Sequence, residues 1–224
     1  MTLSELLSAL VERHTPAPAH VWLASARTAA CDEKRLPAVF TDAFRRLAGT
    51  PVQPTPAEAG TLAAAGYPAA AGAGPTALGR ALLLVEATSA LPSERHVPVL
   101  TRLFRSGDTG ERTALLRALP CLPAPERYAS LAAEACRSSV QDVFEAVATA
   151  NPFAAAHLPA AAFDQMVLKA VFLGVPLAGV VGLASRLTPG LARMATDFRS
   201  ERQAAGRPVP ADLDLLLATG TRSS

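Results

Sequence analysis

Apolar residues recur at helical spacing along most of the chain, and no useful length alternates apolar and polar residues as a half-buried strand does. Four residue pairs have the spacing of a capping box, in which each side chain satisfies a free N–H group at the start of a helix. These pairs are Thr2 with Glu5, Thr55 with Glu58, Asp108 with Glu111, and Ser138 with Gln141. The pattern therefore predicts an all-α fold.

The periodic segments predict helices at residues 2–13, 18–34, 37–48, 56–65, 76–90, 93–106, 109–119, 124–137, 139–150, 160–173, 189–205 and 211–218. From Leu91 to Ala150 they are short, similar in length and joined by tight turns. We expect such antiparallel pairs to stack as a HEAT-like bundle. Because no sequence motif repeats, the repeat is predicted for the architecture only.

Composition divides the chain into four parts. We expect N-terminal helices at 1–50, a Pro/Ala/Gly-rich connection at 51–75, a helical domain at 76–218 and a disordered tail at 219–224. The connection has few bulky side chains, which predicts loose order around one short helix. The N-terminal helices either form a separate lobe or continue the same core, and the pattern leaves both open.

Length and charge narrow the class of protein. A chain of 224 residues can bury one good core, and half of its residues are hydrophobic. The net charge of +2 gives no electrostatic case for binding nucleic acid. The N-terminus lacks the basic segment of a signal peptide, which predicts a cytoplasmic protein. The most hydrophobic window, 166–185, contains Lys169, Pro176 and three glycines, which favours a core helix and loop over a membrane span.

Signatures of cofactor, metal and catalytic chemistry are missing from the sequence. Cys31, Cys121 and Cys136 lie far apart and match no metal or redox spacing, and the four histidines show no HxH or HxxxH pair. We find no P-loop, no GxSxG and no GxGxxG after a strand. We therefore expect no metal and no cofactor, and we assign no catalytic residue.

The predicted helix 160–173 is apolar on nearly every side, and its narrow polar sector contains only Gln165 and Lys169. These two residues are four apart and therefore neighbours on the helix. A lysine is also rare in this chain, since Lys34 is the only other one. The pair is our first candidate for a binding site.

Three interpretations of Lys169 follow from its position. The ammonium can lie at the edge of a groove while its stem covers apolar surface. Alternatively it forms a buried ion pair with a carboxylate from another helix, because an unpaired buried charge is costly. The third interpretation is a functional lysine for anion binding or imine chemistry.

Two other segments contribute candidate binding residues. In the predicted helix 189–205, Arg202 projects into the apolar sector, and Arg193 and Asp197 have i,i+4 spacing at its side. Such an arginine either ties down loop carbonyls or a carboxylate, or lines a pocket for an anion. Asn151 precedes Pro152 at a helix stop, where its amide either caps a neighbouring element or contacts a ligand.

Several motifs occur in the order found in one known family. They are RTALLRALPCLPAPER, VFEAVATANPF, QMVLKAVF and LARMATDFRSERQAAGR, which together lie between Arg112 and Val209. This part of the chain resembles the EboA family. Asn151, Gln165, Lys169 and Arg202 match positions of the family pattern, as do Pro152 and Arg207.

The resemblance implies a role in a conserved bacterial gene cluster that makes or exports a secondary metabolite, and it implies no reaction or catalytic residue. We therefore favour a non-catalytic helical accessory protein that binds a small metabolite or another protein of the cluster. One alternative is an enzyme that uses Lys169 on an anionic or isoprenoid-like metabolite. Another is a peripheral membrane adaptor that docks through the apolar segment 171–187.

Overall fold

The computed structural model describes residues 1–67 and 72–217, and the tail expected at 219–224 lies outside them. The described residues form helices and no strands, which confirms the all-α prediction. The first half contains α1 (Leu3–Arg13), α2 (Ala17–Ala30), α3 (Leu36–Arg46), α4 (Pro56–Ala64), α5 (Pro75–Ala90), α6 (Ser93–Ser106) and α7 (Thr109–Ala118). The second half contains α8 (Ala129–Cys136), α9 (Gln141–Ala148), α10 (Phe153–His157), α11 (Ala160–Leu173), α12 (Leu183–Arg186), α13 (Pro189–Ala204) and α14 (Leu213–Leu217). Three short 3-10 helices are η1 (Leu119–Cys121), η2 (Pro125–Tyr128) and η3 (Leu177–Gly179).

Local start signals place most helices correctly. The capping boxes at the starts of α1, α4 and α7 are all formed. The predicted box of Ser138 with Gln141 is wrong, because the Ser138 hydroxyl accepts the N–H of Val140 and α9 begins two residues later than expected. The helix predicted at 124–137 is divided into η2 and α8. The missed helices α10 and α12 are too short to show a period.

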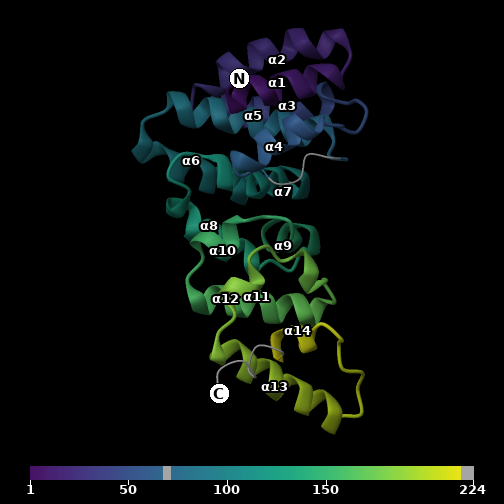
Figure 1. The fold of residues 1–224 in the computed structure, drawn as a ribbon. Helices are drawn as coiled ribbons and strands as arrows, with labels where there is room; N and C mark the ends of the chain where they lie inside the picture. The colour runs from purple at the N-terminus through teal and green to yellow at the C-terminus, as the bar shows by residue number, and fades with distance from the viewer. Residues whose placement is uncertain (68–71, 218–224) are drawn as a thin grey trace.

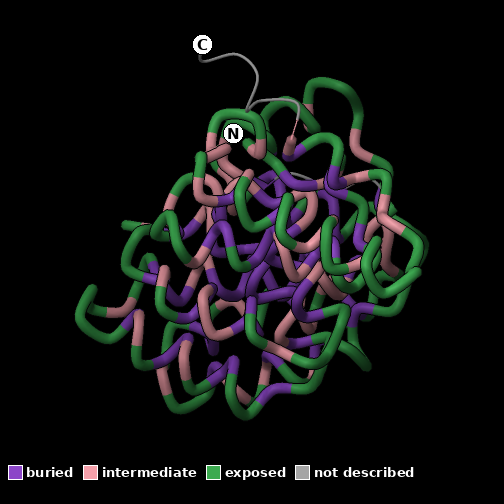
Figure 2. The backbone as a smooth tube through the Cα atoms, turned by 90° about the horizontal axis from the view of Figure 1, so that it is seen from below, coloured by how far each residue is buried: buried purple, intermediate pink, exposed green. Residues whose placement is uncertain are grey.

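The helices stack in layers that follow the order of the chain, from α1–α3 at one end to α13 and α14 at the other (Figure 1). One continuous cluster of buried apolar side chains runs through them, from Leu6 in α1 to Leu216 in α14. Figure 2 shows buried positions inside the molecule and exposed positions at its outer turns. The HEAT-like character of the stack stays a prediction.

The N-terminal helices join this core through α5, which α1, α2 and α3 all contact. Described residues of the 51–75 connection also pack against this core. The side chains of Val52, Leu62 and Tyr67 are buried, and Val52 exchanges backbone hydrogen bonds with Gly72 and Ala73. The expectation of loose order is therefore wrong for these residues. The division of the chain at residues 50 and 75 as domain boundaries stays a prediction.

Cationic side chains link successive layers by donating to backbone carbonyls. Arg117 of α7 donates to the carbonyl of Thr149, just after α9, at 3.0 Å. Arg186 of α12 donates to the carbonyls of Ala155 and Leu158 at 2.6 and 2.7 Å, around the end of α10. The last carbonyls of a helix have no partner within it and lie at the negative end of its dipole. These cations therefore satisfy helix ends across the layer boundaries.

Within residues 1–67 and 72–217, every helix is too short or too polar to cross a lipid bilayer.

Candidate functional site

Helix α11 is buried on one side only. Phe163, Met166 and Val167 are among its buried residues, whereas 59% of Phe172 and 44% of Leu173 are exposed. The helix ends at Gly174, whose left-handed backbone (φ 70°) closes the last turn. As expected, apolar side chains lie on nearly every side of this helix. Part of that apolar surface nevertheless faces outward.

The ammonium of Lys169 caps the C-terminal end of α8. It donates to the carbonyls of Cys136 at 2.8 Å and Ser138 at 2.6 Å, and it lies 4.7 Å from the centroid of the Phe144 ring. Burial of the ammonium lowers the pKa of Lys169 below its usual value. No carboxylate among the described residues forms an ion pair with it, so backbone carbonyls take the place of the acid that we considered.

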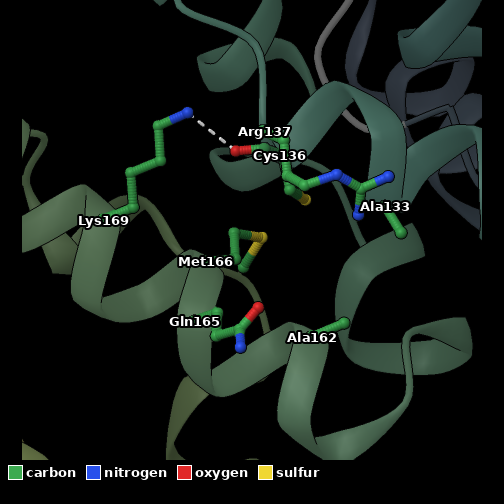
Figure 3. Close-up of a pocket in the computed structure, with 7 residues that line it drawn as sticks. All are labelled: Ala133, Cys136, Arg137, Ala162, Gln165, Met166 and Lys169. Carbon is green, nitrogen blue, oxygen red and sulfur yellow. Dashed lines mark hydrogen bonds between the residues drawn. The ribbon is translucent and has the colours of Figure 1, made fainter.

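A cleft of about 270 Å³ lies between α8 and α11 beside Lys169 (Figure 3). Its lining consists of Ala133, Cys136, Arg137, Ala162, Gln165, Met166 and Lys169. In the described part of the chain, neither the Gln165 amide nor the Arg137 guanidinium is engaged in a side-chain hydrogen bond or ion pair. The cleft thus has a mixed lining of apolar and polar side chains, and two of the polar groups are free to bind a ligand.

Cys136 and Lys169 are the two potential nucleophiles in the lining. Burial raises the pKa of the Cys136 thiol to about 11, so this sulfur is a protonated thiol at neutral pH. The amine of Lys169 is held by two carbonyls, and no acidic side chain lines the cleft. Among the described residues, no three His, Cys, Asp or Glu side chains gather closely enough to hold a metal ion.

Asn151 lies outside this cleft and organises the turn between α9 and α10. Its side-chain N–H groups donate to the carbonyls of Leu116 and Ala146, and its side-chain oxygen accepts the N–H of Phe153. The residue is only 1% exposed. The preceding Ala150 has a left-handed backbone (φ 48°) and donates its N–H to the carbonyl of Gly179. All side-chain polar atoms of Asn151 are therefore used within the protein.

The three candidates on α13 do not line the cleft either. Arg202 donates from Nε to the carbonyl of Pro208 at 2.8 Å and lies over the ring of Phe198. Of the two interpretations of Arg202, the structure therefore shows the one in which the arginine holds a loop carbonyl. Arg193 and Asp197 are exposed, and the expected i,i+4 ion pair between them is not formed. Of the six candidates, the structure brings only Gln165 and Lys169 to one cleft.

Sequence reasoning missed the other side of the cleft. Ala133, Cys136 and Arg137 come from α8 and its C-terminal cap, about 30 residues before Gln165 and Lys169. No periodicity marks them, because their proximity depends on how two layers stack. The one available signal was a lysine on an apolar helix, which needs an oxygen partner from elsewhere.

Fold and cleft together define an all-α protein with a small amphipathic cleft between two helical layers. A family comparison matches residues 3–217, almost the whole chain, to the family described as "Metabolite traffic protein EboA". The chain belongs to the EboA family. No curated protein and no solved structure gives a significant match.

Proposed function

We propose that the protein is a non-catalytic accessory protein of metabolite traffic, and that the cleft between α8 and α11 binds the metabolite. The observation that carries this proposal is the pair of unengaged polar groups, on Arg137 and Gln165, at a cleft that they share with the apolar side chains of Ala133, Ala162 and Met166. Ligand pockets in proteins have this composition, with a few polar groups that orient the ligand. The cleft lies near the lower end of the usual range of pocket volumes, which favours a small ligand.

A binding role fits Lys169 better than imine chemistry does. A lysine nucleophile must release its amine to the substrate, whereas this amine caps the end of α8. Release would leave the carbonyls of Cys136 and Ser138 without their donor. Arg202, which the enzyme alternative also needs, is hydrogen-bonded to a loop away from the lining. We therefore assign Lys169 the task of positioning α8 against α11.

The wider setting follows from the family resemblance. We infer that the protein acts in the cytoplasm, in a bacterial gene cluster for a secondary metabolite, and that it presents the bound metabolite to another protein of that cluster. A stack of helices without a catalytic constellation suits such a carrier, because both the cleft and the outer helical faces are available for contacts.

The test is affinity purification from the native cell, with mass spectrometry of the retained small molecules. The variant Ala162→Leu places a larger side chain in the cleft lining, and Ala161→Leu is its matched control on the exposed side of the same helix. We expect the wild type and Ala161→Leu to retain the same compound and Ala162→Leu to lose it. Circular dichroism checks that both variants fold. Equal retention by the two variants would overturn the cleft as the binding site.

A second candidate function, peripheral membrane contact, is favoured by the apolar surface of the segment 171–187. Phe172, Leu173 and Val181 are exposed there, and a groove of about 410 Å³ lined by apolar side chains such as Leu183 and Leu187 lies nearby. Exposed apolar surface of this kind often marks an interaction site. Flotation with liposomes tests it, and Phe172→Ser should reduce flotation. A wild-type protein that stays at the bottom of the gradient excludes this candidate.

A further inference from the structure

One arginine, Arg137, lines the α8–α11 cleft, and two others lie near Glu134 in the last turns of α8. Arg137 directly follows the last residue of α8, and its exposed side chain lines the cleft. Arg105 of α6 donates to Glu134 from Nε at 3.2 Å and from Nη2 at 2.8 Å. Arg112 of α7 donates to the carbonyl of Arg105 at 3.3 Å. Three helices thus bring guanidinium groups to the region of one carboxylate.

The effect on that carboxylate shows that these charges share one electrostatic environment. The hydrogen bond from Arg105, with the charges of Arg105, Arg137 and Arg112, lowers the pKa of Glu134, and burial only partly opposes the effect. Arg105 neutralises Glu134 by direct contact. Arg137 and Arg112 therefore remain as cations without a carboxylate partner of their own in the described part of the chain.

Lys169 changes the electrostatic potential at the C-terminal end of α8. The C-terminal end of a helix carries partial negative charge, which would repel an anion. The Lys169 ammonium is bonded to the carbonyl of Cys136 at that end, and to that of Ser138. These contacts offset the negative end of the dipole, so the positive charge of Arg137 is left to dominate the opening. The lining contains two cations and no acid.

We propose that the ligand of this cleft is a small amphipathic metabolite with an anionic phosphate or carboxylate group. The anion binds the guanidinium of Arg137, whose parallel N–H groups match two oxygens of such a group. The Gln165 amide, on the opposite side of the opening (Figure 3), donates a further hydrogen bond, and the apolar part of the ligand packs on Met166, Ala133 and Ala162. This inference rests on the proposed function of the cleft.

Two matched probes test it: pentyl phosphate, and 1-pentanol as its uncharged counterpart, with affinities measured by isothermal titration calorimetry. We expect the phosphate to bind the wild type about tenfold or more tightly than the alcohol, as one charge-assisted contact implies. Arg137→Gln should remove most of this difference. Arg127→Gln, which removes an exposed arginine outside the lining, is the control and should bind as the wild type does. Added salt should weaken phosphate binding in the wild type more than in Arg137→Gln.

The outcomes distinguish two claims, that the ligand is an anion and that it binds in the cleft. Equal affinity for both probes, with both lost in Ala162→Leu and retained in Ala161→Leu, overturns the anion and leaves the cleft in place. Retention of both probes by Ala162→Leu overturns the cleft as the binding site. If neither probe binds the wild type, the cleft and the anion are both overturned. An equal loss in Arg127→Gln and Arg137→Gln would mean that general charge, and not the Arg137 contact, attracts the anion. Flotation with phosphatidic acid vesicles that depends on Arg137 would assign the anion to a lipid headgroup and overturn a soluble metabolite.

Discussion

Replacement of Lys169 by methionine tests the role of this lysine most directly. Methionine keeps most of the apolar stem and removes the ammonium. The carbonyls of Cys136 and Ser138 then lose their charged donor, and the C-terminal end of α8 loses the cation that offsets its dipole. We therefore expect the substitution to reduce stability by weakening the contact between α8 and α11.

The magnitude follows from the contacts. A hydrogen bond from a charged donor contributes about 1.5–3 kcal/mol when buried, and the nearby Phe144 ring adds about 0.5–1 kcal/mol. Two effects reduce the sum. Lys169 is only partly buried, so water replaces part of each bond, and the substitution removes the cost of desolvating the ammonium that lowers its pKa. A net loss of about 2 kcal/mol in the free energy of unfolding remains.

Urea denaturation followed by far-UV circular dichroism measures this loss. With a slope of about 2 kcal/mol per molar urea, the midpoint should fall by about 1 M. Lys34→Met is the matched control, because Lys34 is the only other lysine and its exposed side chain makes no ion pair or hydrogen bond in the described structure. Lys169→Arg should retain much of the stability because it keeps a charged donor. If Lys169→Met and Lys34→Met shared one midpoint, the capping role would be refuted.

Three further predictions concern other positions. Asn151→Ala should cost about 2–4 kcal/mol, because it removes three buried hydrogen bonds, and a loss below about 1 kcal/mol in the same urea assay would contradict this. The hydrogen bond from Arg13, supported by the cap at Thr55, lowers the pKa of Glu58 from 4.5 to about 2, so its stabilisation is complete above pH 4.5 and is lost as the pH falls toward 2. The difference in melting temperature between the wild type and Glu58→Gln should therefore shrink across that window, and a constant difference would argue against the ion pair. Ellman's reagent should modify the exposed Cys31 first in the native protein and reach the buried Cys136 only after unfolding, and peptide mapping that finds Cys136 modified in the native protein would contradict the packing.

Sequence was sufficient wherever the physical cause was local. Helical spacing of apolar residues and the capping boxes at Thr2, Thr55 and Asp108 act within a few residues, so they predicted the all-α fold and the starts of three helices. The same reasoning failed at Ser138, whose hydroxyl satisfies a nearer N–H group than expected. A short side chain with two competing backbone donors is not decided by spacing alone.

The candidate site was predictable only in part. Gln165 and Lys169 stood out because polar residues on an apolar helix need partners. Asn151 and Arg202 stood out for the same reason, yet their partners are backbone groups, such as the carbonyl of Leu116 in α7 for Asn151 and that of Pro208 for Arg202. A polar residue that breaks an apolar pattern thus signals a need for hydrogen bonds. The pattern does not say which group satisfies it.

The sequence by itself determined that the chain is helical, where most helices begin and end, and which helix carries an isolated cation. Only the tertiary structure decided that this cation caps α8 and that Arg137 and Gln165 line the same cleft. The physical reason is that backbone carbonyls occur at every residue and leave no mark in the sequence. Which carbonyls lie near Lys169, and which side chains line the space beside it, depends on how the layers of α8 and α11 stack.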